Sequence, residues 1–134
     1  MDMYGKWSLT FDDRLPIYCQ IILRFKRAFV RGDLSPGDRI PSIRELSAAL
    51  KVNTNTIQRV YQEMERDEII SSKRGTGYYI TEDSEMTDKM RQELTKDSVK
   101  RFVDEMCELG LKKNEILTEV ESYMKGDGHS ESNS

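Results

Sequence analysis

The sequence contains few of the residues that bind metals or form disulfides. There are two cysteines and one histidine in 134 residues. Cys19 and Cys107 form no CxxC pair, and one histidine with two isolated cysteines cannot supply a zinc finger or a His-rich catalytic metal centre. Both cysteines fall within apolar helical patterns, so we expect reduced core residues rather than a disulfide or redox pair. The sequence predicts no metal and no cofactor.

Features of membrane, exported and catalytic proteins are also missing. No apolar run approaches the roughly 18 residues of a membrane-spanning helix, and the N-terminus lacks the basic-then-apolar order of a secretory signal. There is no Gly-rich phosphate loop followed by Lys-Ser/Thr and no GxSxG motif. We therefore expect a cytoplasmic protein that is not an enzyme and has no membrane partner.

Charge is distributed unevenly along the chain. The net charge is −3, but residues 1–80 contain 13 Lys/Arg and 10 Asp/Glu, whereas residues 81–134 contain 8 and 14. The basic excess of the first part fits a DNA-contacting module, and the acidic second part fits a segment kept away from phosphate. This excess is small and is weak evidence by itself.

The first part of the chain has the signals of two successive helices. Apolar residues recur at every fourth position within residues 17–29, which predicts an amphipathic helix. Pro16 suits its first turn and Gly32 suits its end. Ser42 and Glu45 then form a capping box at the start of a short second helix.

A third helix and a hairpin follow after a short break. Either Asn53 or Thr54 can cap this helix. Residues 69–73 and 78–81 predict two short strands, and the glycines of residues 74–77 allow the tight turn between them. The apolar residues of the inward helix face are Ile57, Val60, Tyr61 and Met64.

The C-terminal part predicts two further helices. A helical apolar stripe extends over residues 86–109, Gly110 ends it, and residues 116–124 carry a second stripe. The stripes could form a core within one chain or a dimer seam. We favour the seam, because two such helices packed only on each other leave apolar surface uncovered. The predicted dimerisation residues are Leu94, Phe102, Met106, Ile116, Val120 and Met124.

The order of these elements is that of a winged helix-turn-helix. The predicted fold is mainly α with a small β-hairpin, with a DNA-binding domain in residues 1–81, a helical dimerisation region in residues 82–126 and a disordered tail in residues 127–134. Such a third helix fits the major groove, where Asn55 and Gln58 suit adenine, and the basic hairpin tip can reach the DNA backbone or minor groove. The polar residues that we expect at DNA are Thr54, Asn55, Thr56, Gln58 and Arg59 on the helix, with Lys73 and Arg74 on the hairpin.

Several segments resemble one family of bacterial regulators. Residues 15–21 (LPIYCQI), 36–46 (PGDRIPSIREL), 52–61 (VNTNTIQRVY) and 74–77 (RGTG) are similar to motifs of the GntR family, and the match covers about residues 11–81. The short helical C-terminus resembles the YtrA-type subfamily, whose members lack a large effector domain and dimerise through these helices.

The resemblance implies a homodimer that binds double-stranded operator DNA and represses a nearby operon, often one for membrane transport. In the family, the arginine of the PSxREL motif contacts DNA, and Arg44 occupies this position. Family contacts at the wing tip correspond to Arg74 and Gly75. The binding of an unidentified small-molecule effector in a cleft at the dimer interface is compatible with this sequence.

The sequence departs from the family at three positions. Thr54 stands where proline is frequent in the subfamily, Thr76 stands where a basic residue is common, and Tyr78 replaces a small residue. The operator sequence therefore cannot be transferred from relatives. A protein–protein interaction module is the alternative for a winged helix, and it would need an apolar patch on the third helix, which the polar face does not supply.

Overall fold

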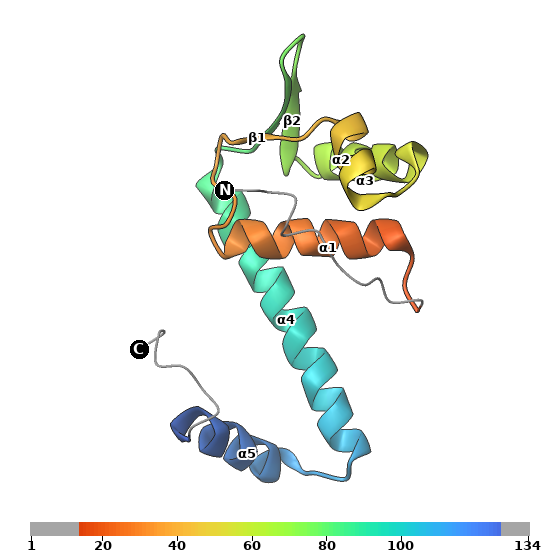
Figure 1. Ribbon diagram of the computed structural model, residues 1–134. Helices are drawn as coiled ribbons and strands as arrows, with labels where there is room; N and C mark the ends of the chain where they lie inside the picture. The colour runs from red at the N-terminus through yellow and green to blue at the C-terminus, as the bar shows by residue number, and fades with distance from the viewer. Residues whose placement is uncertain (1–13, 127–134) are drawn as a thin grey trace. The chain divides into compact units, whose positions relative to one another are not determined.

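The computed structural model describes residues 14–126, so residues 1–13 and the predicted disordered tail, 127–134, lie outside the described residues. The chain folds into helices and a small sheet (Figure 1), as predicted. In chain order the elements are α1 (Ile17–Val30), β1 (Arg39–Ile40), α2 (Ile43–Leu50), α3 (Thr54–Arg66), β2 (Ile70–Lys73), β3 (Gly77–Ile80), α4 (Ser84–Glu108) and α5 (Lys113–Lys125).

The chain divides into two compact units, the first ending at Gln92 and the second beginning at Glu93. The first turns of α4 thus belong to the first unit. Met90 is buried in its core, Met86 packs against that core, and Arg91 Nη2 donates a hydrogen bond to the Val30 carbonyl at 3.1 Å. The functional division into residues 1–81 and 82–126 stays a prediction.

Local signals set the ends of α2 and α3. The capping box is confirmed, because Ser42 N–H donates to Glu45 Oε1 at 2.9 Å and Glu45 N–H donates to Ser42 Oγ at 3.0 Å. Lys51 has a left-handed conformation, with φ 56°, which ends α2. Of the two candidate caps of α3, the cap is Asn53, whose side chain accepts a hydrogen bond from Asn55 N–H at 2.7 Å.

The core of the first unit is built around α3, which packs against both α1 and α2. All four residues of the predicted inward face are buried, and Ile57 and Val60 are 0% exposed. The Tyr61 ring meets the Tyr78 ring of β3 edge-on, with centroids 4.9 Å apart. Burial of such side chains stabilises the fold by about 1.5–3 kcal/mol each.

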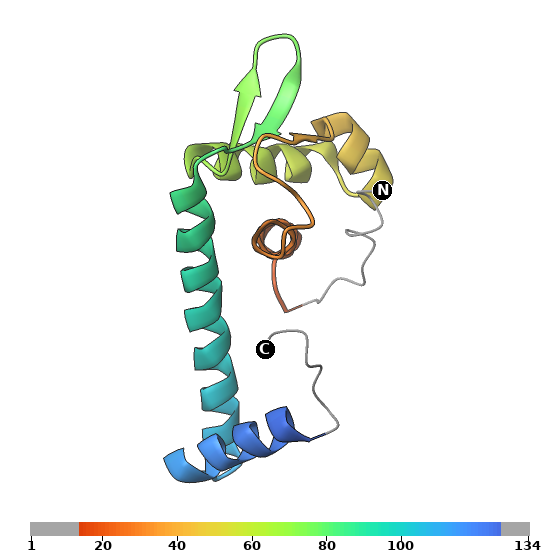
Figure 2. The same ribbon diagram turned by 90° about the vertical axis from the view of Figure 1, so that its left-hand side faces the viewer.

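The sheet is antiparallel in the order β1-β3-β2. Its hairpin, β2 with β3, is within one residue of the predicted strands and projects beyond the helices of this unit as a wing (Figure 2). Strand β1 was not predicted, because two residues carry no periodic signal. In the register, Lys73 lies opposite Gly77 and Arg39 lies opposite Tyr79.

In the second unit, α4 ends as the sequence predicts. Gly110 takes φ 93°, and Leu111 N–H donates to the Met106 carbonyl at 3.1 Å, which closes the last turn. The expectation of two core cysteines is wrong for Cys107, which is exposed because it lies beside the apolar stripe of α4, while Cys19 is partly buried. Both are free thiols. No helix within residues 14–126 combines the length and hydropathy needed to cross a bilayer.

The buried face of α3 gives a stability prediction. Ile57→Ala should lower the free energy of unfolding by about 2–5 kcal/mol, because Ile57 is 0% exposed and its loss leaves a cavity. Its exposed neighbour is the control, and Gln58→Ala should change stability by less than about 0.5 kcal/mol. Urea denaturation of both variants checks this, and equal losses would contradict the helix orientation.

Candidate nucleic-acid interface

The exposed face of α3 is polar throughout. It lines one open, shallow hollow of about 530 Å³. Its side chains carry amides, guanidinium groups and one carboxylate, and none is apolar. This composition suits hydrogen bonding to base edges and phosphates, and it lacks the apolar patch that a protein-docking helix needs. The lining residues are Asn55, Gln58, Arg59, Gln62, Glu63 and Arg66.

The predicted base-reading residues gather at the N-terminal end of this face. Thr54 and Asn55 form the first turn of α3 and are exposed, and Gln58 follows one turn later, also exposed. Thr56 is partly buried, so less of its side chain is open to a ligand. The partial positive charge of a helix N-terminus favours phosphate at this end.

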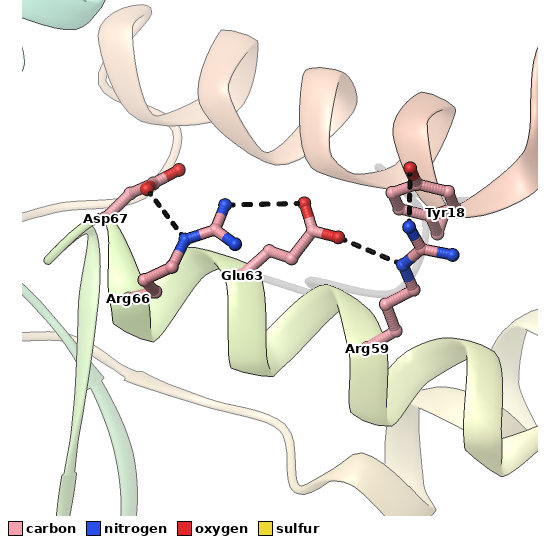
Figure 3. Close-up of polar contacts among 5 residues, drawn as sticks. All are labelled: Tyr18, Arg59, Glu63, Arg66 and Asp67. Carbon is pink, nitrogen blue, oxygen red and sulfur yellow. Dashed lines mark hydrogen bonds and ion pairs between the residues drawn. The ribbon is translucent and has the colours of Figure 1, made fainter.

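Arg59 is held by contacts within the chain. Figure 3 shows its guanidinium between α1 and Glu63: Nη2 donates to the Tyr18 hydroxyl at 2.9 Å, and Nε donates to Glu63 Oε2 at 3.0 Å. The guanidinium carbon lies 3.7 Å from the Tyr18 ring centroid, a cation–π contact. The hydrogen bond to Glu63 is the main cause that raises the pKa of Arg59.

These contacts continue along α3 as a line of alternating charges. The second oxygen of Glu63 lies 3.8 Å from Arg66 Nη2, and Arg66 Nε lies 3.4 Å from Asp67 Oδ1 (Figure 3). Sequence reasoning missed Tyr18 and Glu63 as partners of Arg59. The four-residue spacing of Arg59 and Glu63 is a signal that could have identified the second of these.

The wing presents cations at a glycine turn. Thr76 N–H donates to the Lys73 carbonyl at 2.9 Å, and Gly75 takes φ 77°, a conformation that glycine adopts without strain. Lys73 Nζ lies 4.4 Å from the Tyr79 ring centroid. Arg74 is exposed, and within residues 14–126 it forms no ion pair.

Arg44 is exposed in the first turn of α2. Its neighbour Glu45 is committed to the helix cap, and the hydrogen bond from the Ser42 backbone, followed by that from its hydroxyl, lowers the pKa of Glu45. In the described part of the chain, Arg44 is paired with no acid. Its guanidinium is therefore available to a ligand.

Comparison with known proteins identifies the family. The family model described as "Bacterial regulatory proteins, gntR family" matches residues 17–80. The uncharacterized HTH-type transcriptional regulator YhcF of Bacillus subtilis is 43% identical over 116 residues, which cover 87% of this chain and 96% of YhcF. The chain belongs to the GntR family. It is therefore a DNA-binding transcriptional regulator and not an enzyme, as predicted.

Two further GntR-family relatives extend the match beyond the DNA-binding region. The HTH-type transcriptional repressor YtrA of Bacillus subtilis is 35% identical over 115 residues, or 83% of this chain and 88% of YtrA. A solved GntR family transcriptional regulator from Listeria monocytogenes is 41% identical, with a TM-score of 0.77, and the match covers 84% of this chain and 98% of that one. These matches confirm the predicted resemblance to YtrA-type regulators and the winged helix-turn-helix with C-terminal helices.

The alternating charges along α3 give a second prediction. Glu63→Gln removes the carboxylate that Arg59 shares with Arg66, so a DNA phosphate can pair with Arg59 instead. We expect tighter binding to any duplex, with a salt dependence steeper by about 1 in slope. Fluorescence anisotropy at several salt concentrations measures both.

The matched control is Asp104→Asn, which neutralises the acid of another i,i+4 pair, with Lys100, in the second unit. It should leave the slope unchanged. If Glu63→Gln binds DNA with the wild-type affinity and slope, Arg59 is not a DNA contact and serves only to join α3 to α1.

Proposed function

We propose that the protein is a homodimeric repressor that binds a specific operator and controls a nearby operon, with transport genes as the first candidates. The single observation that carries the proposal is the combination, in one unit, of a polar exposed α3 face with cations at Arg44 and Arg74 that pair with no described acid. The printed description of YtrA as a repressor supports the direction of control. The proposed protein acts in the cytoplasm.

In this proposal the interface has three parts with different tasks. The N-terminal end of α3 reads base edges in the major groove through Asn55 and Gln58. Arg44 contacts the DNA beside the start of α3, where its planar guanidinium can donate two parallel hydrogen bonds to the DNA. The wing supplies sequence-independent affinity through Lys73 and Arg74, with Gly75 allowing close approach to the DNA.

The second unit supplies the proposed dimer interface. An apolar groove of about 510 Å³ lies between α4 and α5, and it includes Phe102, Met106 and Val120. Large apolar side chains stay exposed in this unit, including Leu109 at 71% and Met124 at 45%. Exposed apolar surface of this kind is stabilised by a second copy of the chain.

The predicted dimerisation residues differ in how much of each side chain is exposed to solvent in a single chain. Ile116 is 7% exposed and is already buried by its own chain, so it is a core residue of the second unit. Leu94, Met106 and Val120 are partly buried, while Phe102 and Met124 are exposed and are the better candidates for contact with a partner.

The assignment of Arg44 gives the central test of function. The probe is a duplex selected by the full-length protein from a random pool. Arg44→Ala should lower affinity for this duplex by on the order of 1–3 kcal/mol with the melting temperature nearly unchanged. Arg44→Lys should recover only part of the loss, since lysine keeps the charge but not the planar fork.

Arg31→Ala is the control, because Arg31 is an exposed arginine already paired with Asp33 at 2.7 Å. It should bind as the wild type does. Wild-type affinity of Arg44→Ala would refute the assignment, and failure of the wild type to select any duplex would favour a protein-interaction module instead.

The dimer proposal predicts that the wild type sediments at micromolar concentration with twice the 15.6 kDa chain mass. Phe102→Lys should shift the protein toward monomer, because the substitution places a charge in the apolar groove. Thr118→Lys, an exposed change on α5 outside the groove lining, should leave the dimer intact. A monomeric wild type would contradict the proposal.

A further inference from the structure

The side chain of Arg39, in β1, is exposed and extends along the wing. Its Cα pairs with Tyr79 of β3, yet its guanidinium lies against Gly77, two residues closer to the wing tip. A Cβ atom at Gly77 would lie 3.0 Å from Arg39 Nε and 3.4 Å from Nη2. The side chain therefore crosses the bare backbone of Gly77, and any larger residue there would displace it.

The position of Gly77 is also restricted by its backbone. Its φ of 123° lies in a region that residues with side chains rarely adopt. The backbone conformation therefore favours glycine at this point, and the absence of a side chain lets the Arg39 guanidinium lie close to the Gly77 backbone.

The described residues supply no acidic partner for Arg39. In residues 14–126 it forms no ion pair, and residues 69–81, which include the whole hairpin, contain no acid. Glu45, whose carboxylate senses the charge of Arg39, is held by Ser42 in the capping box. An exposed guanidinium in this setting has hydrogen-bond donors and a charge left for an anion.

Arg39 lies in a group of cations at the wing. Lys73 is directly opposite Gly77 in the sheet, and Arg74 follows it in the turn. Thr76, the residue between Gly75 and Gly77, is uncharged. Arg39 therefore adds a third cation near the tip from a different strand.

We propose that Arg39 is a further DNA contact, with its guanidinium binding a backbone phosphate beside the wing tip. This inference rests on the proposed function. Phosphate is the partner that the chemistry favours, because a planar guanidinium matches two phosphate oxygens, and cations on a hairpin whose own residues, 69–81, include no acid attract the DNA backbone. The contact carries no base preference, so it adds affinity and register and leaves operator choice to α3.

The test compares Arg39→Ala with the wild type on two duplexes, the selected one and one of scrambled sequence. Arg39→Ala should weaken binding to both by a similar factor, on the order of tenfold, and lower the salt slope by about 1. Arg31→Ala, which removes a paired arginine, should change neither quantity. The double variant Arg39→Ala with Thr76→Lys should recover affinity and slope, because it returns a cation to the same tip.

Three results separate this proposal from the proposed function. If the wild type selects a duplex and Arg39→Ala binds both duplexes unchanged, Arg39 is not a contact and the proposed function stands. Loss on the selected duplex alone, with an unchanged slope, would assign Arg39 to base reading and overturn a phosphate contact. Absence of any DNA binding by the wild type overturns both. The melting temperature of each variant shows whether a loss of binding reflects unfolding.

Discussion

The complete burial of one face of α3 is the constraint on which the DNA-binding unit depends. Ile57 and Val60 have no exposed surface, and the period of 3.6 residues then forces Asn55 and Gln62 to the opposite side. Tyr61 extends this control, because its hydroxyl donates to the Pro41 carbonyl before α2 and its ring packs on Tyr78 in the wing. The helix, the start of α2 and the hairpin are thus fixed by one buried surface.

Much of this arrangement could be predicted from local sequence, because its signals are local. The apolar period of α3, the capping box at Ser42 and the glycines of the wing each act within a few residues, and all three are present in the structure. The contact of Arg59 with Tyr18 could not be predicted, since the residues are 41 positions apart and only the packing of α1 on α3 joins them. The same limit explains why Ile116 was predicted at the dimer interface. The sequence pattern identifies the apolar face of its helix, but it does not show that residues of the same chain bury Ile116.

The beginning of α4 shows how packing can override a boundary suggested by composition. The acidic residues after the wing indicate a change of region, yet Met90 lies in the core of the first unit and Arg91 binds the end of α1. The helix then continues without a break past Gln92, where the second unit begins. The residues of α4 are therefore divided between the two units, and no loop or glycine marks the change.

Net charge is a poor guide to what this protein binds, because pairing decides which charges are available. The chain carries a net charge of −3, but acids near the interface are occupied: Glu63 by two arginines and Glu65 by the Ser72 hydroxyl at 2.9 Å. Glu45 is held in a helix cap. The arginines that pair with no acid among residues 14–126 include those at the wing and at the start of α2. An acidic protein can therefore present a cationic surface to DNA, since caps and ion pairs hold carboxylates near that surface, while the guanidinium groups that we propose as phosphate contacts pair with no acid among the described residues.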